Sequence, residues 1–146
     1  MEQMILYFDT AHAIEVHDWI IEHTGGRSGI LDIGLLDSAL QHIQNDDYYP
    51  TFEEKLAHLV FAINKFHAFN DGNKRSSVTL GAYFLMLNGY DYCVPRFLID
   101  LENIVVAIAD NQVSKDLLQM LITSLIAEDD YSDELKLRLL DALGGL

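Results

Sequence analysis

The chain has 146 residues, half of them apolar, which predicts one domain large enough to bury a core without disulfide or metal cross-links. Its net charge of −14 argues against a general nucleic-acid binder, so we expect no direct contact with nucleic acid. The single cysteine, Cys93, excludes an internal disulfide and a cysteine-rich zinc site, and the lack of a long uncharged apolar run or a leader-like start favours a cytoplasmic protein without a membrane segment.

The first third of the sequence predicts two helices separated by a glycine-rich segment. Thr10 can cap a helix that runs to about Thr24 and ends at two glycines. Residues 25–34 contain four glycines and predict a loop or a small hairpin. Apolar residues then recur at helical spacing from Leu35 to about Asn45, which predicts the second helix.

The centre of the sequence predicts the two most buried helices. Thr51 and Glu54 have the spacing of a capping box, and the helix that they open reaches about Phe66. The next helix is expected from about Asn73 to Asn88. It carries no charged residue in its second half, so we expect it at the centre of a bundle.

The last third of the sequence predicts a short strand and three more helices. Residues 90–94 alternate like a strand, which the following proline would end. Helices are expected over about 98–110 and 115–127, the second capped by Ser114, and a final amphipathic helix begins at Ser132. The leucines of that final helix either pack on the body of the protein or receive a partner, and packing is favoured. The whole pattern is typical of an all-α domain.

Residues 67–77, HAFNDGNKRSS, place a polar segment between two apolar helices. Unpaired polar groups in a protein interior cost on the order of a few kcal/mol each, so such a segment needs a compensating contact or function. Phe69 alternates with the polar residues and is expected to be a buried anchor that fixes the loop.

Positive charge gathers at this loop. Lys65, Lys74 and Arg75 are three of the nine cationic side chains in the chain and lie within eleven residues. The first amide groups of the helix that begins near Asn73 lack intrahelical partners, and the helix dipole makes that end positive, so the loop is suited to phosphate. The alternative is structural, with one of the cations closing a helix end or pairing with Asp71.

Two further groups of the loop fit phosphate chemistry. A carboxylate such as Asp71 at an anion site is consistent with magnesium, which takes one or two protein carboxylates and completes its shell with phosphates and water. Histidine exchanges a proton near neutral pH, so His67 could be the general base toward an attacking hydroxyl. Each residue also has an ordinary interpretation: a histidine at a helix end, a turn at Asp71-Gly72 and a cap at Asn73. The other five histidines lack the spacing of a metal site, and His58 is assigned to packing.

The segment HAFNDGNKR (67–75) resembles the signature HxFx(D/N)(A/G)NKR of the death-on-curing (Doc) toxins, a branch of the Fic superfamily. Residues 25–40, GGRSGILDIGLLDSAL, are similar to the glycine-rich flap and second helix of that family, and the resemblance covers roughly residues 5–128. It implies a compact all-α Fic fold, a bundle of about six to seven helices with a small flap or β-hairpin. Residues 1–129 would form the Fic/Doc domain, and residues 130–146 a C-terminal helical extension of it.

The same resemblance implies a role for each residue of the loop. His67 would be the catalytic base and Asp71 the magnesium ligand, while glycine at position 72 would allow close approach of the backbone to the nucleotide. With Lys65 from the cation cluster, the phosphate-binding group is expected to comprise Gly72, Asn73, Lys74 and Arg75. The flap would hold the target protein by main-chain pairing, through residues Gly26, Arg27, Ser28, Gly29, Ile30 and Leu31.

Two positions depart from the AMP-transferring members of the superfamily. Those members resemble one another in having glycine where this chain has Lys74, and a second arginine where it has Val78. The departures favour the Doc-type reaction, in which ATP presents its γ-phosphate and the protein acts as a protein kinase. The resemblance then implies ATP and Mg2+ as ligands, elongation factor Tu as the known Doc-type target, arrest of translation, and a small antitoxin protein as partner.

Two other functions stay open on the sequence. One is AMP transfer to a protein hydroxyl, and the other is a catalytically silent module that acts by protein contact, which the acidity and the C-terminal extension favour. Residues 124–129, SLIAED, come close to the inhibitory motif (S/T)xxxE(G/N) of some Fic proteins but end in Asp129. We interpret the match as a coincidental i,i+4 pair of Ser124 and Glu128.

Overall fold

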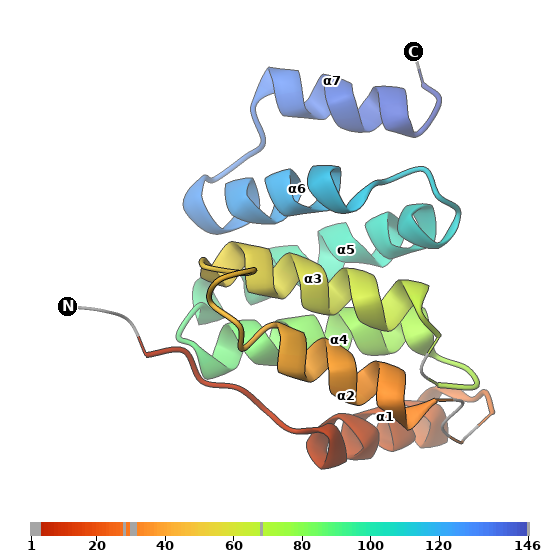
Figure 1. The fold of residues 1–146 in the computed structure, drawn as a ribbon. Coiled ribbons are helices and arrows are strands. Elements are labelled where there is room, and N and C mark those ends of the chain that lie inside the picture. Colours follow the sequence, from red (N-terminus) through yellow and green to blue (C-terminus); the bar gives the residue numbers. More distant parts are fainter. Residues whose placement is uncertain (1–3, 28, 30–31, 68, 146) are drawn as a thin grey trace.

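Two antiparallel helices, α3 (Phe52–Lys65) and α4 (Asn73–Leu87), form the centre of the molecule, and every other helix packs on one of them or on a helix that does. The computed structural model describes residues 4–27, 29, 32–67 and 69–145, and within these ranges it contains seven α-helices, one short 3-10 helix and no strand (Figure 1). The predicted all-α class is therefore confirmed. Residues 25–34 were predicted as a loop or a small hairpin; the described residues 25–27, 29 and 32 lie in neither helix nor strand, residues 33 and 34 already belong to the second helix, and the rest of the segment lies outside the described residues.

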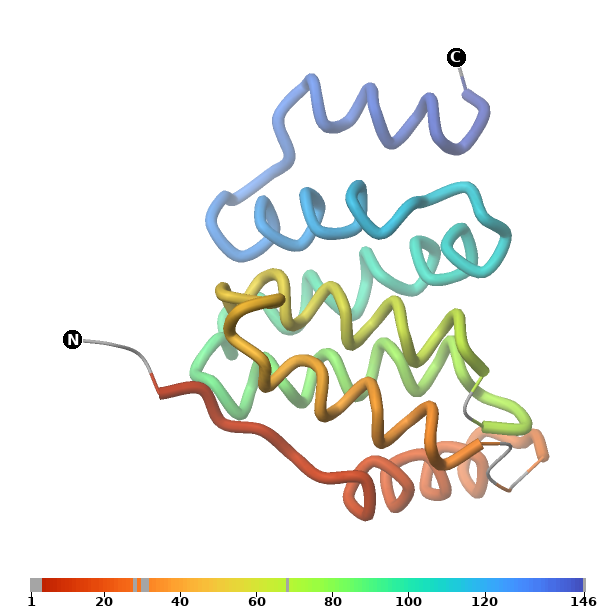
Figure 2. Tube along the Cα trace, viewed as in Figure 1, coloured from red at the N-terminus to blue at the C-terminus, as the bar shows by residue number. Residues whose placement is uncertain are grey.

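The other helices are stacked on the central pair. Figure 1 shows α1 at one end of the stack and α7 at the other, and Figure 2 shows the segment before α1 running extended along its flank. That segment is fixed where the backbone N–H of Leu6 donates to Asn88 Oδ1 at 2.8 Å, just after α4. The remaining elements are α1 (Thr10–Thr24), α2 (Ile33–His42), η1 (Asp91–Cys93), α5 (Val94–Ala109), α6 (Lys115–Ala127) and α7 (Asp133–Ala142).

Side-chain caps begin several helices where the sequence predicts them. The backbone N–H of Glu54 donates to Thr51 Oγ1 at 3.2 Å, which is the predicted cap. The Glu54 carboxylate accepts the Thr51 hydroxyl at 3.1 Å rather than the backbone N–H of Thr51, so the predicted capping box is formed in one of its two bonds only. Ser114 caps α6 and Ser132 caps α7 in the same way. These starts were predictable because a cap is a local contact between residues three apart.

Two predictions about local structure are wrong. The side chain of Asp9, not Thr10, caps α1, because it accepts the N–H of His12 at 2.8 Å while the Thr10 hydroxyl donates to Asp37 instead. Residues 90–94 form the 3-10 helix η1 and the start of α5 rather than a strand. The proline at position 95, which we expected to end a strand, lies in the first turn of α5, where its fixed φ and missing N–H suit a helix.

The C-terminal helix packs on the body through part of its leucine stripe. Leu135 is buried and Leu139 is partly buried, whereas Leu140 and Leu143 remain exposed. The connection to α6 is fixed by Tyr131, whose hydroxyl donates to Asp100 at 2.8 Å, and burial raises the pKa of that hydroxyl well above its usual value. The packing prediction therefore holds for one side of α7 only.

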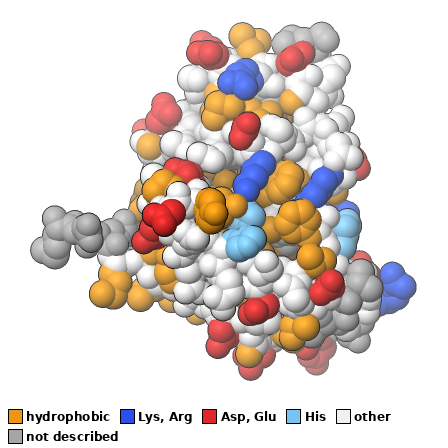
Figure 3. Space-filling model, in the orientation of Figure 1, with side chains coloured by type: hydrophobic (Ala, Val, Ile, Leu, Met, Phe, Trp, Pro, Cys, Tyr) orange, Lys and Arg blue, Asp and Glu red, His pale blue; other side chains and the backbone are white. Residues whose placement is uncertain are grey.

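Acidic side chains dominate the charged groups on the face of the molecule shown in Figure 3. They are spread along the stack, and few basic side chains lie among them. This distribution matches the net charge of −14 and offers no broad basic surface on that face.

Gly81 allows the close contact of α4 with its neighbours. A Cβ atom at this position would lie 2.8 Å from Phe97 Cζ and 3.0 Å from Val60 Cγ2, and both neighbours are fully buried. Overpacking of this kind costs about 1–3 kcal/mol, which exceeds the gain of about 1 kcal/mol from alanine over glycine in a helix.

We therefore expect Gly81→Ala to lower the free energy of unfolding by about 1 kcal/mol in urea denaturation. Thr123→Ala, at an exposed position of α6, is the control and should change it by no more than about 0.5 kcal/mol. A higher urea midpoint for Gly81→Ala would contradict the packing argument.

Candidate active site

The chain turns between α3 and α4 beside the C-terminal end of α1, so that three helix ends meet at one place (Figures 1 and 2). We call residues 66–72 the α3–α4 turn. It carries three of the predicted site residues, His67, Asp71 and Gly72, and the first turn of α4 carries three more, Asn73, Lys74 and Arg75.

The side chain of Asn73 fixes the α3–α4 turn from inside. Its Oδ1 accepts the backbone N–H of Phe69 at 3.1 Å, and its Nδ2 donates to the Phe69 carbonyl at 2.9 Å. The residue is 8% exposed, so both amide contacts are shielded from water. A phosphate contact at Asn73 would therefore use its backbone N–H rather than its side chain.

Phe69 is the buried anchor that the sequence predicts, and it packs on a residue that the sequence analysis did not single out. Phe69 is 1% exposed, and its ring stacks on the ring of His17 with centroids 3.8 Å apart and planes 5° from parallel. His17 Nε2 also lies 2.6 Å from the carbonyl oxygen of Asp71. One signal could have found it: His17 lies at helical spacing from the buried residues Ala13 and Ile21 and so shares the inner face of α1.

Gly72 has a backbone conformation that other residues rarely adopt. Its φ is +73°, and a Cβ atom there would lie 3.0 Å from Ile21 Cδ1 and 3.5 Å from His17 Nε2. The backbone at Gly72, which we expected to approach a nucleotide closely, approaches the side chains of Ile21 and His17 on α1 in this structure. Because Gly72 is also the N-cap of α4, no side chain caps that helix end.

The carboxylate of Asp71 accepts two backbone hydrogen bonds. Oδ1 accepts the N–H of Gly72 at 2.8 Å, and Oδ2 accepts the N–H of Arg27 at 3.2 Å. These two bonds, with the charges of Arg75 and Arg27 nearby, hold the pKa of Asp71 below its usual value. The side chain is therefore an anion at neutral pH, and its oxygens retain lone pairs for a further ligand.

A cation at Asp71 would have one protein carboxylate as ligand. The described residues contain no group of three or more His, Cys, Asp or Glu side chains that could enclose a metal ion. Magnesium can be held by a single protein carboxylate, since water and substrate phosphates complete its coordination shell. The ionised, partly exposed carboxylate at the end of an uncapped helix fits that donor set.

The described part of the flap lies on the α3–α4 turn. Arg27 donates its N–H to Asp71, and the carbonyl of Gly29 accepts the N–H of Asn70 at 3.2 Å. At Gly26 a Cβ atom would lie 2.8 Å from Asp71 Oδ2, so the backbone passes directly over the carboxylate. The other predicted flap residues, Ser28, Ile30 and Leu31, lie outside the described residues.

Arg75 contacts the C-terminal end of α1, which agrees with the structural alternative that one of the cations closes a helix end. Its guanidinium donates to the hydroxyl of Thr24 and to the carbonyl of Gly25, at 3.3 Å for the second contact. Arg75 is nevertheless exposed and lies beside the flap and Asp71. It is thus near the other predicted site groups but is bound to the C-terminal end of α1.

Lys65 does not join the phosphate-binding group to which it was assigned. Its ammonium donates to the carbonyl of Ile108 at 3.3 Å and to Asn111 Oδ1, at the C-terminal end of α5. A cation is stabilised at the C-terminal end of a helix by the negative end of the helix dipole and by the last carbonyls, so these contacts of Lys65 are structural. Proximity in sequence misled the prediction.

His67 and Lys74 are exposed and unengaged. Neither side chain has a hydrogen bond or ion pair with any residue that the structure describes. His67 has a φ of +52°, a conformation that non-glycine residues seldom adopt and that is often found at functional sites. Among the described residues, the side chains of His67 and Lys74 are therefore not committed to a structural contact.

A groove of about 310 Å³ continues from the start of α4 to α5. On its α4 side, Val78 replaces the second arginine of the AMP-transferring pattern, so the wall is apolar where that pattern has a cation. The other lining residues are Lys74, Arg75, Thr79, Leu98, Glu102, Val105 and Val106.

His58 packs as predicted. It is buried, and its Nδ1 lies 3.0 Å from the hydroxyl of Tyr49 and 2.7 Å from the ammonium of Lys115. Burial, followed by the charge of Lys115, lowers its pKa to about 4.

A family of known proteins matches the part of the chain that contains this candidate site. The sequence pattern of the Fic/DOC family matches residues 7–85, more than half of the chain, and this range includes α1, α2, α3 and all of α4 except its last two residues. The chain belongs to the Fic/DOC family.

One curated relative is the protein named Toxin Doc from Mycolicibacterium smegmatis (strain ATCC 700084 / mc(2)155). It is 38% identical over 69 residues, which cover 44% of this chain and 53% of the relative. The chain thus spans about half the length of the curated relative that it matches. Separately, none of the helices among the described residues combines the length and apolar character needed to cross a lipid bilayer.

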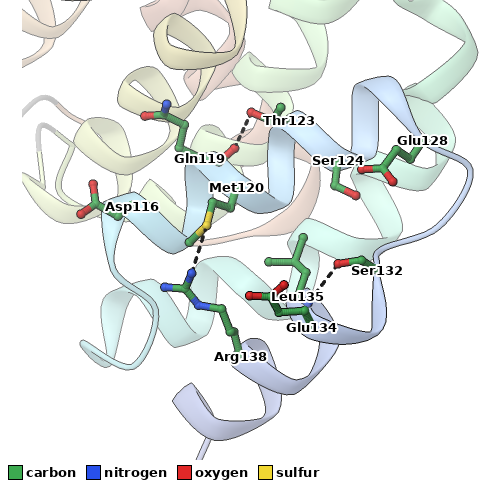
Figure 4. A pocket seen from close by; sticks show the side chains of 10 residues that line it. All are labelled: Asp116, Gln119, Met120, Thr123, Ser124, Glu128, Ser132, Glu134, Leu135 and Arg138. Atoms are coloured by element: carbon green, nitrogen blue, oxygen red, sulfur yellow. Dashed lines mark hydrogen bonds between the residues drawn. The ribbon is translucent and has the colours of Figure 1, made fainter.

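The resemblance of residues 124–129 to an inhibitory motif has no counterpart at the candidate site. Ser124 and Glu128 line a hollow of about 510 Å³ between α6 and α7, shown in Figure 4. In Figure 1 the C-terminal end of α6 and the α3–α4 turn lie at opposite sides of the stack. The backbone N–H of Glu128 donates to the Ser124 carbonyl and ends α6, which agrees with an ordinary i,i+4 pair.

The lowered pKa of Asp71 predicts a pH-dependent contribution to stability. A carboxyl whose pKa is lower in the folded than in the unfolded state stabilises the fold above its ordinary value of 3.8, and this contribution is lost as the pH falls through the folded value. We expect the urea midpoint of unfolding to be higher for wild type than for Asp71→Asn at pH 7, and this difference in midpoint to shrink below pH 3.8. A difference that does not vary with pH would contradict the hydrogen-bonded, ionised carboxylate.

Proposed function

We propose that the protein transfers the γ-phosphate of ATP to a hydroxyl group of a target protein. The observation that carries the proposal is the grouping, within residues 67–75, of the exposed His67, the ionised Asp71, the uncapped end of α4 and the free ammonium of Lys74 among the described residues. Phosphoryl transfer depends on positioning and on neutralising charge, and these groups are suited to both tasks.

The phosphates of ATP would bind at the N-terminal end of α4. Backbone N–H groups of the first turn have no side-chain cap, and the helix dipole favours negative charge there. Lys74 would contribute a point charge, and Arg75 would exchange its contacts with the end of α1 for a phosphate. Magnesium, held by Asp71 and the phosphates, would supply further neutralisation of charge.

His67 would act as the general base. Its ring would accept the proton of the target hydroxyl as that oxygen bonds to the γ-phosphorus, and the bond from the γ-phosphorus to the bridging oxygen would break to release ADP. An exposed imidazole without a competing hydrogen bond to any described residue is available for that task.

Lys74 and Val78 support γ-phosphate transfer rather than AMP transfer. In the AMP-transferring pattern, glycine at the first position leaves room for the nucleotide and arginine at the second grips the distal phosphate. Here the first position carries a long cation and the second lies on the apolar wall of the α4–α5 groove. The triphosphate would therefore bind in the orientation of Doc-type proteins.

We further propose that the protein is the toxin of a toxin–antitoxin pair. The relative named Toxin Doc supports this role, and the Doc resemblance extends it to elongation factor Tu as target, arrest of translation as the result and a small antitoxin as partner. The flap would present backbone groups to the target segment by main-chain pairing. In the described structure, the N–H of Arg27 and the carbonyl of Gly29 are already bonded to the α3–α4 turn, so other groups of the flap would have to serve.

The choice of reaction is tested by label transfer. We expect label from γ-labelled ATP, and none from α-labelled ATP, to appear on a target protein incubated with the enzyme and Mg2+. His67→Ala should reduce transfer about 100-fold or more, the usual effect of removing a general base, whereas His42→Ala, an exposed histidine of α2, should transfer normally.

Other outcomes of this experiment point to other functions. Transfer of the α-label would replace the kinase with an AMP transferase. If neither label is transferred and growth inhibition survives His67→Ala, the protein acts by contact rather than by catalysis.

The role of Asp71 is tested without catalysis. Asp71→Ala should weaken binding of Mg-ATP about tenfold or more in calorimetric titration, the effect of losing one contact to a charged group, and should keep the helical fold. Asp116→Ala, which removes an exposed carboxylate from the first turn of α6, is the matched control. Equal affinities of wild type and Asp71→Ala would remove Asp71 from the proposed site.

A further inference from the structure

His17 is a polar residue on the inner face of α1. Its side chain is fully buried, whereas the other buried residues of that helix are Ala13, Ile20 and Ile21. One ring face stacks on Phe69, and the edge that carries Nε2 lies against Gly72. The ring therefore fills the space between α1 and the α3–α4 turn.

The hydrogen bond of His17 determines which ring nitrogen carries a proton. Nε2 lies 2.6 Å from the carbonyl oxygen of Asp71, and a carbonyl can only accept. Nε2 is therefore the donor. On the other side of the ring, Nδ1 lies 3.4 Å from the carboxylate of Asp18, which is largely exposed.

The bond from His17 holds the turn at the peptide between two functional elements. Asp71, whose carbonyl it fixes, carries the candidate magnesium ligand, and Gly72, the next residue, begins α4 by accepting the N–H of Ser76 at 2.8 Å. Fixing that carbonyl also fixes the direction of the Gly72 N–H, which donates to the Asp71 carboxylate. One imidazole thus sets both the carboxylate and the exposed amides of the helix end.

We propose that His17 is a positioning residue of the phosphate site, acting through the main chain of Asp71. This inference rests on the proposed function for its effect on catalysis. Packing alone does not require a polar ring, because phenylalanine would fill the same space and stack on Phe69. Among the described residues of the turn, the polar group that the Nε2 donor reaches is the carbonyl of Asp71.

Two substitutions separate the two contacts of the ring. His17→Phe keeps an aromatic ring for Phe69 but removes the donor, and His17→Gln keeps an N–H donor near the position of Nε2 but removes the stack. His12→Phe is the matched control, because His12 is also on α1 and its ring centroid lies 4.7 Å from that of Tyr83, while its buried Nε2 has no hydrogen-bond partner among the described residues. Urea midpoints of all variants separate global stability from local effects.

We expect His17→Phe to speed hydrogen exchange at the amides of Phe69 and Gly72 about tenfold relative to amides elsewhere, the factor that one net hydrogen bond provides. It should lower the kcat for phosphate transfer by a similar factor and weaken the binding of Mn2+, used as a probe for Mg2+. His17→Gln should recover most of each effect, and His12→Phe should show none.

The outcomes distinguish this inference from the proposed function. Wild-type exchange at both amides in His17→Phe would overturn the positioning role, and so would equal losses in His17→Phe and His17→Gln, which would mark a packing role alone. If wild type transfers no label, the proposed function fails, and the ratio of exchange rates between the two variants still decides whether His17 holds the turn.

Discussion

The site depends on a single side-chain amide. Asn73 satisfies both backbone groups of Phe69 and does so from the first residue of α4, so the turn and the helix that follows it are joined as one rigid unit. Unpaired, the two backbone groups would cost about 1–3 kcal/mol each in this buried location. Because the Asn73 amide forms hydrogen bonds with both groups, the side chain of Phe69 can be buried while the polar residues on either side of it face outward.

The α3–α4 turn is completed by contacts from a helix about fifty residues earlier in the chain. His17 and Ile21 of α1 form the surface on which Phe69 and Gly72 lie, and Thr24 at the end of α1 accepts a bond from Arg75. The glycine at position 72 is required twice, by its positive φ and by the closeness of Ile21. Function at the turn is therefore inseparable from the packing of α1 on α4.

Local patterns predicted the helices well, and distant contacts explain what they missed. The caps at Thr51 and Ser114 and the start of α4 at Asn73 follow from contacts within four residues, which the sequence displays directly. The partners of Lys65 and His17 lie 43 and 54 residues away, and no local pattern contains them. Lys65 was therefore assigned to the wrong group, and His17 was overlooked.

The same distinction applies within the turn itself. Residue types led us to expect a site for phosphate and metal, because few kinds of side chain suit such ligands. They did not indicate that the amide of Asn73 is engaged with Phe69, or that Arg75 is engaged with α1, since both facts depend on the three-dimensional path of the chain. The sequence thus displayed the residue types of the candidate site, but it did not predict which of those side chains have structural contacts and which are exposed.

If the proposed function holds, an acidic protein binds an anionic nucleotide, and the effect of each protein charge on binding depends on its distance from the phosphates. Electrostatic effects between exposed groups fall off over about 8 Å at physiological ionic strength. The acidic side chains are spread over the surface, as Figure 3 shows for one face, so salt screens most of them from a ligand at the end of α4. The ammonium of Lys74 and the amides of the first helical turn would touch the phosphates and are screened far less. A net charge of −14 is thus compatible with a nucleotide site, because that site needs only a few positive groups at contact distance.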